Sequence, residues 1–166
     1  MKKDHPTAIN GTPPDAFELE NFLPYQLSLL TNTISQGMAR SYRSQHEISV
    51  TEWRTIAVLG RFPGLTASEV VARTAMDKVA ISRAVKNLIQ NKLLLRVTDR
   101  KDRRKRRLYI SPGPGQKVLE EVVPLAREYE KDLLQSLNSD ELQTLIQIIS
   151  KLQQAAIRTN AEKANP

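Results

Sequence analysis

Apolar residues recur at helical spacing through most of the chain, and this pattern predicts a mainly α-helical protein. One stripe follows a helix expected to start at Asn21 and reaches Tyr42, with Pro24 tolerated in the first turn. Two further stripes run from residue 118 to 137 and from residue 142 to 156, the first expected to bend at Pro124. Short apolar runs at residues 93–95 and 108–110 instead predict the two strands of a hairpin.

Three helix starts are marked by capping residues. Ser49 with Glu52, and Thr66 with Glu69, have the spacing of capping boxes, in which a hydroxyl and a carboxylate satisfy the free N–H groups of a first turn. Asp77 is a good N-cap residue for the next helix. The sequence therefore predicts a short helix over about residues 67–73 and a second one directly after it.

The second of these short helices has two different faces. Ile81, Val85 and Leu88 recur at helical spacing and should be buried. The opposite face carries hydrogen-bonding groups, namely Lys78, Ser82, Arg83, Lys86 and Asn87. Two short helices joined by a brief turn, the second with a polar stripe, follow the helix-turn-helix plan, so this stripe is the candidate surface for reading DNA.

The segment between the two expected strands is strongly basic. From Arg96 to Arg107 it holds eight Lys or Arg residues against two Asp, a net charge of +6 where the whole chain carries +7. A hairpin with this charge is typical of a loop that meets nucleic-acid phosphates, although a solvated charged hairpin would have the same composition.

These two stretches resemble the MarR-type winged helix-turn-helix regulators. The residues that carry the resemblance are the helix DKVAISRAVKNLIQNKLLLR, with Ser82-Arg83 where the family has Thr or Ser before Arg, and the wing DRKDRRKRRLYIS, with the family's Asp-Arg-Arg at residues 102–104. In helix order the resemblance extends from about Phe22 to Ala156. It implies a mostly α fold with a small β-hairpin wing, a winged helix-turn-helix with N- and C-terminal dimerisation helices.

The resemblance also implies how DNA is contacted. The second helix of the motif would enter the major groove, while Arg104 at the wing tip would reach the adjacent minor groove and Asp102 would orient it. Arg103 and Arg106 complete the basic side chains expected at this interface. The chain departs from the family at two places. Lys92 follows the helix where Gly is usual, so Asn91 is expected to take the left-handed conformation. The segment 110–115 (ISPGPG) replaces the Leu-Thr-x-x-Gly pattern that usually ends the wing, and its residues 112–115 should form a hinge-like stop.

The expected organisation is a flexible arm at residues 1–16, an N-terminal dimerisation helix within 17–47, the DNA-binding region at 48–112, C-terminal dimerisation helices within 113–160 and a disordered tail at 161–166. The terminal helices have long apolar stripes that a compact winged helix does not need. A homodimer that buries them against a second copy is the simplest expectation.

Other chemistry is poorly supported by the sequence. The chain has no cysteine, and its two histidines, His5 and His46, lack a metal-ligand spacing or a neighbouring nucleophile, so both are expected to be exposed bystanders. No glycine-rich phosphate loop is present. We therefore expect no cofactor, no metal and no enzymatic activity. The N-terminus lacks an apolar signal region, so we expect a cytoplasmic protein that does not enter a membrane.

Two functions remain open. The resemblance implies a repressor that binds a near-palindromic operator and releases it when a small molecule binds, in a pocket to which five residues are assigned: Tyr25, Ser28, Arg40, Arg43 and Trp53. The chain's Phe-Leu-Pro-Tyr and Thr-Glu-Trp-Arg segments resemble those of regulators of aromatic-acid breakdown. This resemblance suggests an aromatic carboxylate or its coenzyme A thioester as the effector. The ordinary alternative is that Trp53 is core and the arginines are surface charges. An architectural DNA-coating protein without a ligand is the second function.

Overall fold

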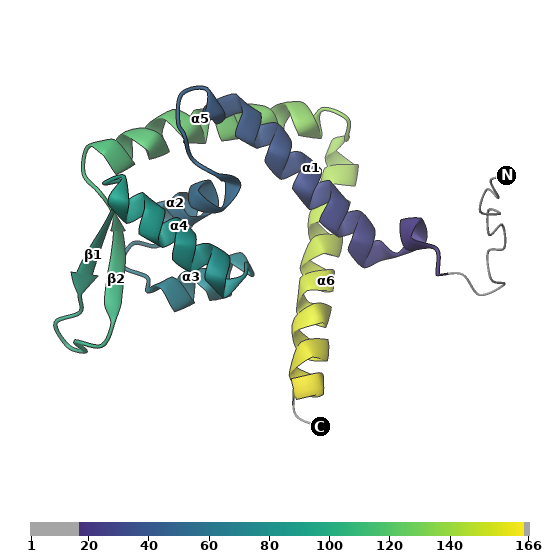
Figure 1. The fold of residues 1–166 in the computed structure, drawn as a ribbon. Helices are drawn as coiled ribbons and strands as arrows, with labels where there is room; N and C mark the ends of the chain where they lie inside the picture. Colours follow the sequence, from purple (N-terminus) through teal and green to yellow (C-terminus); the bar gives the residue numbers. More distant parts are fainter. Residues whose placement is uncertain (1–16, 165–166) are drawn as a thin grey trace, which may run out of the picture. The chain divides into compact units, whose positions relative to one another are not determined.

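The structure is a computed structural model that describes residues 17–164, so the expected arm at residues 1–16 and the last two residues of the expected tail lie outside the described residues. Two compact units are present, one reaching Gly37 and the other starting at Met38, and each is described by itself. The elements in chain order (Figure 1) are η1 (Leu19–Asn21), α1 (Leu23–Arg43), α2 (Val50–Arg61), α3 (Ala67–Thr74), α4 (Lys78–Gln90), β1 (Leu94–Thr98), β2 (Arg106–Ile110), α5 (Pro114–Leu134) and α6 (Ser139–Ala164). The expected fold class, mainly helical with a two-stranded hairpin, is confirmed.

The first unit consists of η1 and most of α1. Asn21 ends the 3-10 turn, so α1 starts at Leu23 and not at the predicted Asn21, with Pro24 in its first turn as expected. Apolar side chains of this unit are more than a third exposed, among them Phe17, Leu23, Leu27 and Leu30. Within residues 17–37, the described part of this unit, Phe17 packs edge-on against Phe22, yet these apolar side chains stay in contact with water.

The second unit is built around α2, which packs against α3, α4, β2 and α5. The predicted inward residues Ile81, Val85 and Leu88 of α4 are buried, as are Ile56 and Leu59 of α2. Every one of these side chains is at most 2% exposed. Burial of this apolar stripe, more than helix propensity, fixes α4 against the unit and leaves its other face free.

All three predicted helix caps are present. The Glu52 amide donates to Ser49 Oγ (3.2 Å) and the Ser49 amide to the Glu52 carboxylate (2.7 Å). The same reciprocal pair joins Thr66 and Glu69 at the start of α3, at 3.3 and 2.7 Å. Asp77 accepts from the amide of Ala80 (2.9 Å) and begins α4. These bonds satisfy amides that a helix start otherwise leaves free.

The end of α4 differs from the prediction. Asn91 has an ordinary φ of −81°, whereas Lys92 takes the left-handed conformation with φ 60°, so the assignment of this conformation to Asn91 was wrong. The amides of Lys92 and Leu93 donate to the carbonyls of Ile89 (3.0 Å) and Leu88 (2.8 Å). This is the Schellman arrangement, and it requires the left-handed residue at the second position after the helix.

The strands are longer than their apolar runs. β1 and β2 pair antiparallel from Leu94 opposite Ile110 to Thr98 opposite Arg106, so the ladder extends into the charged segment. The other edge of β2 is also occupied, because Leu108 donates to the carbonyl of Leu65 (2.9 Å) and accepts from the amide of Gly64 (2.9 Å). The wing is thereby joined to the segment that leads into α3.

The segment expected as a hinge-like stop is partly helical. Gly113 is left-handed (φ 85°), and Pro114 and Gly115 form the first turn of α5, because proline suits a first turn that needs no N–H. Gly115 is required there: a Cβ would lie 2.2 Å from the carbonyl oxygen of Leu93. The expected tail is also wrong over residues 161–164, where Ala, Glu and Lys favour helix and α6 continues to Ala164.

Candidate nucleic-acid interface

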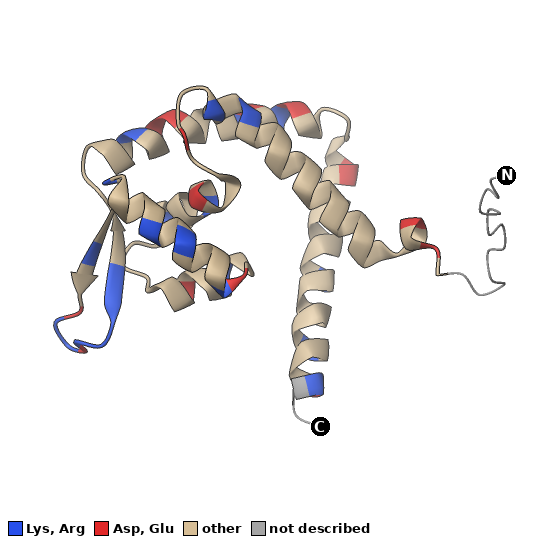
Figure 2. Cartoon of the chain, in the orientation of Figure 1, with Lys and Arg blue, Asp and Glu red and all other residues tan. Residues whose placement is uncertain are grey.

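The predicted reading surface of α4 is open to solvent. Five side chains of this helix are exposed, namely Lys78, Ser82, Arg83, Lys86 and Asn87, and Figure 2 shows basic residues along α4 and over the hairpin. Val79, in the first turn, is also 54% exposed, and the sequence interpretation did not include it in this surface. The surface can therefore offer charged, hydrogen-bonding and apolar groups to one partner.

At the wing tip, Arg104 is bonded to Asp102 and exposed to solvent. Its side chain is 93% exposed, while Asp102 Oδ1 accepts from both the Arg104 amide (3.1 Å) and Nε (3.3 Å). The two predicted partners are thus brought together, with the guanidinium tip projecting into solvent. Arg103 is exposed, and Arg106 is exposed and donates through its guanidinium to Thr98 Oγ1 across the hairpin.

A second ion pair holds the base of the wing loop. Arg107 Nε donates to Asp99 (2.7 Å), Arg107 also donates to the Gly64 carbonyl (3.0 Å), and it lies 3.7 Å from the Glu69 carboxylate. The hydrogen bond from Arg107, with amide bonds from Asp102 and Lys101, lowers the pKa of Asp99 to about 2. Sequence reasoning counted Arg107 only as a basic residue, yet Asp99 and Arg107 face each other across the loop.

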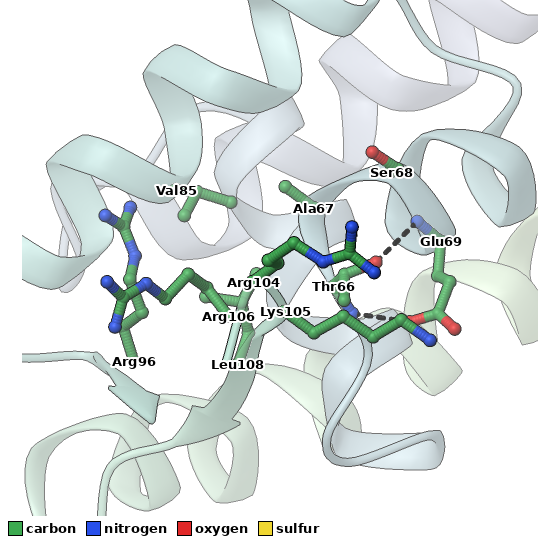
Figure 3. A pocket seen from close by; sticks show the side chains of 10 residues that line it. All are labelled: Thr66, Ala67, Ser68, Glu69, Val85, Arg96, Arg104, Lys105, Arg106 and Leu108. Atoms are coloured by element: carbon green, nitrogen blue, oxygen red, sulfur yellow. Dashed lines mark hydrogen bonds between the residues drawn. The ribbon is translucent and has the colours of Figure 1, made fainter. Parts of the chain in front are cut away.

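A groove of about 610 Å³ lies between the start of α3 and the wing. Its apolar lining comes from Ala67, Val85 and Leu108, and its cations come from the hairpin and the loop, namely Arg96, Arg104, Lys105 and Arg106. Figure 3 shows Arg96 and Arg106 toward one end of the groove, and Lys105 with Glu69 toward the other. The groove is not a site that the sequence predicted, because it needs the packing of the hairpin against α3.

The residues assigned to a ligand pocket fall in both units. Tyr25 and Ser28 are exposed in the first unit, and Arg40 and Arg43 are exposed in the second. Trp53 is 7% exposed and lies in the core, with its ring 6.0 Å from that of Tyr42. Because the five residues are divided between the two units, their grouping in one pocket stays a prediction.

His46 is not the exposed bystander that was expected. Its side chain is 12% exposed, and Nε2 lies 2.9 Å from the Glu121 carboxylate of α5, so it links the segment before α2 to α5. His5 lies outside the described residues. Within residues 17–164, no cluster of three or more His, Asp or Glu could hold a metal ion, and no helix of this part is long and apolar enough to cross a membrane.

The DNA-binding region is similar in sequence to known transcriptional regulators. Residues 46–105, from the segment before α2 to the wing loop, match the model of the MarR family. Over 119 residues the chain is 26% identical to the HTH-type transcriptional regulator TcaR of Staphylococcus aureus (strain Newman), covering 71% of this chain and 78% of TcaR.

Two solved structures have the same fold. A MarR/EmrR family transcriptional regulator from Acinetobacter sp. ADP1 matches with a TM-score of 0.77 at 25% identity, over 86% of this chain and 99% of that one. BpsR of Bordetella bronchiseptica, described with a mechanism for regulation of its DNA binding by 6-hydroxynicotinic acid, matches with a TM-score of 0.72 at 20% identity, over 82% and 96%. Residues 46–105 therefore match the MarR family of transcriptional regulators, and the chain has the winged helix-turn-helix fold of MarR-family structures.

Proposed function

We propose that this regulator is a homodimeric repressor that binds operator DNA and releases it when a small anionic effector binds. The observation that carries the proposal is the exposed polar face of α4 beside the basic wing, in which Asp102 supports an Arg104 side chain that is 93% exposed. In this proposal the chain acts in the cytoplasm, has no catalytic role and needs no cofactor.

The two elements would make different contacts. α4 fits the major groove, where Arg83 and Lys86 can donate to guanine O6 and N7, and Asn87 can bond adenine. Ser82 and Lys78 can meet base edges or phosphates beside them. The Arg104 guanidinium would enter the neighbouring minor groove, whose negative potential is greatest where A·T-rich sequence narrows it.

Dimerisation is supported by apolar surface at both ends of the described chain. In α6, Leu145, Ile149 and Leu152 are 39–43% exposed, and Ile146 is 60% exposed. In α1, Leu27 and Leu30 are 42% and 53% exposed. Large apolar side chains in such numbers are expected to be covered by another copy. A two-fold dimer would place its two α4 helices about 34 Å apart, one turn of DNA, and would select a palindromic operator.

The effector is proposed to be an aromatic carboxylate or its coenzyme A thioester. BpsR, a protein of the same fold, is described with an aromatic acid that regulates its DNA binding, and an arginine pair such as Arg40 and Arg43 suits a carboxylate or phosphate. Tyr25, Ser28 and Trp53 complete the proposed pocket. An effector can release DNA only if it prefers the conformation that DNA disfavours, so effector and operator must weaken each other's binding by the same factor.

The test of DNA recognition is selection of duplexes from a random library, followed by competition between the selected and shuffled duplexes. Arg83→Ala should lose about 1–3 kcal/mol of preference for the selected site, while Arg127→Ala, an exposed cation of α5, should lose none. If the library yields no preferred sequence while DNA is still bound tightly, an architectural DNA-coating protein replaces the repressor.

The test of release is a titration of the operator complex with aromatic acids and thioesters, for the wild type and for Arg43→Ala. The variant should bind operator normally, because Arg43 lies outside the basic wing, and should fail to release it. Equal release midpoints would move the pocket away from Arg43.

A further inference from the structure

We infer that the groove between α3 and the wing holds a phosphate group of the DNA backbone, with Arg96 as its main ligand. This inference rests on the proposed function, and it adds a contact that is independent of base sequence. It also assigns a role to a strand residue that lies outside both the reading face of α4 and the wing tip.

The strand register determines which side chains enter the groove. Arg96 is opposite Leu108, and Thr98 is opposite Arg106. Directly opposed residues, and residues two apart, lie on the same face of a hairpin. Leu94 and Leu108 on this face are each 1% exposed. Arg96 and Arg106 therefore stand on the inward face of the wing, where the groove begins.

The lining suits one anion with an apolar neighbour. Four cations border the groove, against a single carboxylate, that of Glu69. This carboxylate is already engaged, since it accepts from the Thr66 amide at 2.7 Å, and that hydrogen bond lowers the pKa of Glu69. Its charge is therefore present at neutral pH but is directed to the helix cap and to Lys105 and Arg107. Arg96 remains for a ligand, as do the donors of Arg106 that do not bond Thr98.

The proposed docking geometry supplies the anion. When α4 occupies a major groove and the wing occupies the next minor groove, the backbone strand between these grooves must cross the space between α4 and the wing. The groove is in this space, because Val85 of α4, the start of α3 and the inner face of the hairpin all line it. A phosphodiester of that strand would meet Arg96 and Arg106, and its sugar would meet the apolar lining.

The first experiment measures affinity for a random duplex and for the selected operator at several KCl concentrations. Arg96→Gln should weaken both by a similar factor, roughly tenfold, and should reduce the slope of log K against log salt by about 0.9, the value for one phosphate. Arg127→Gln is the matched control and should leave the slope unchanged. An unchanged slope for Arg96→Gln, in a variant whose unfolding curve matches the wild type, would overturn the inference.

The second experiment locates the phosphate with the wild-type protein. Neutral methylphosphonates are placed one at a time along the operator backbone. One position per half-site, between the major groove and the flanking minor groove, should weaken wild-type binding about tenfold and should not weaken Arg96→Gln further. Equal losses for both proteins at every position would contradict the assignment.

Free phosphate has the same chemistry and is tested separately. At constant ionic strength, replacing KCl by potassium phosphate should release DNA no better than KCl itself. If phosphate binds to the wild type but not to Arg96→Gln while the operator stays bound, the groove is a site for a free anion and the backbone assignment is wrong. Failure to select any operator would overturn the repressor proposal alone, because the salt slope on a random duplex still tests the phosphate contact.

Discussion

Replacing Lys92 by glycine should stabilise the protein. Lys92 has φ 60°, a conformation that costs a residue with a Cβ about 1–2 kcal/mol. Glycine removes this cost but loses about 0.5–1 kcal/mol through the greater freedom of the unfolded chain. The main-chain bonds of Lys92, from its amide to Ile89 and from Ser111 Oγ to its carbonyl, do not depend on its side chain. The expected net gain is therefore roughly 0.5–1 kcal/mol.

The assay is urea unfolding at one fixed protein concentration, because the apparent stability of the proposed dimer would depend on concentration. Asn91→Gly is the matched control. Asn91 has a negative φ of −81°, so glycine at this position removes no backbone strain. It should therefore lower the free energy of unfolding by about 0.5–1 kcal/mol. The opposite pair of signs, with Asn91→Gly stabilising and Lys92→Gly destabilising, would mean that Asn91 is the left-handed residue and would refute this reasoning.

Three further perturbations test other parts of the molecule. Gly115→Ala should lower the free energy of unfolding, measured in urea, by about 1–3 kcal/mol, because the added Cβ would lie 2.2 Å from the Leu93 carbonyl oxygen. The Asp99 carboxyl should titrate near pH 2 by NMR, not at its ordinary pKa of 3.8. The stabilisation that the Asp99 carboxylate gives to the folded protein is present above pH 3.8 and is lost as the pH falls through 2. Arg107→Gln should raise the titration midpoint of Asp99. Truncation before Ser139 should give monomers or aggregates by light scattering, and an unchanged oligomer would place the interface elsewhere.

Features that depend on a few neighbouring residues were predictable from the sequence. The capping boxes at Ser49 and Thr66 were found because both partners lie within four residues of each other. The buried stripe of α4 was found because one face of a helix repeats every three or four residues. The pairing of Asp102 with Arg104 was implied by the resemblance to the MarR-type regulators, and its hydrogen bonds are equally local.

Features that depend on distant packing were missed. Arg107 was recognised as a cation, but its bond to Asp99 appears only when the hairpin closes, and its bond to Gly64 appears only when β2 lies beside the segment before α3. Gly115 reads as a helix breaker, whereas its lack of a side chain lets α5 start against Leu93. The left-handed residue was misplaced because asparagine tolerates that conformation better than lysine, while the pattern of carbonyls at the helix end decides the position.

Footprinting of the selected operator with hydroxyl radicals tests the central claim most directly. A sequence-specific dimer should protect two half-sites whose centres lie one helical turn apart, with added protection in the flanking minor grooves that is lost in Arg104→Ala. Arg83→Ala should lose the half-site protection while general affinity remains. Uniform protection along the duplex, unchanged by either substitution, would contradict sequence-specific recognition by α4 and the wing.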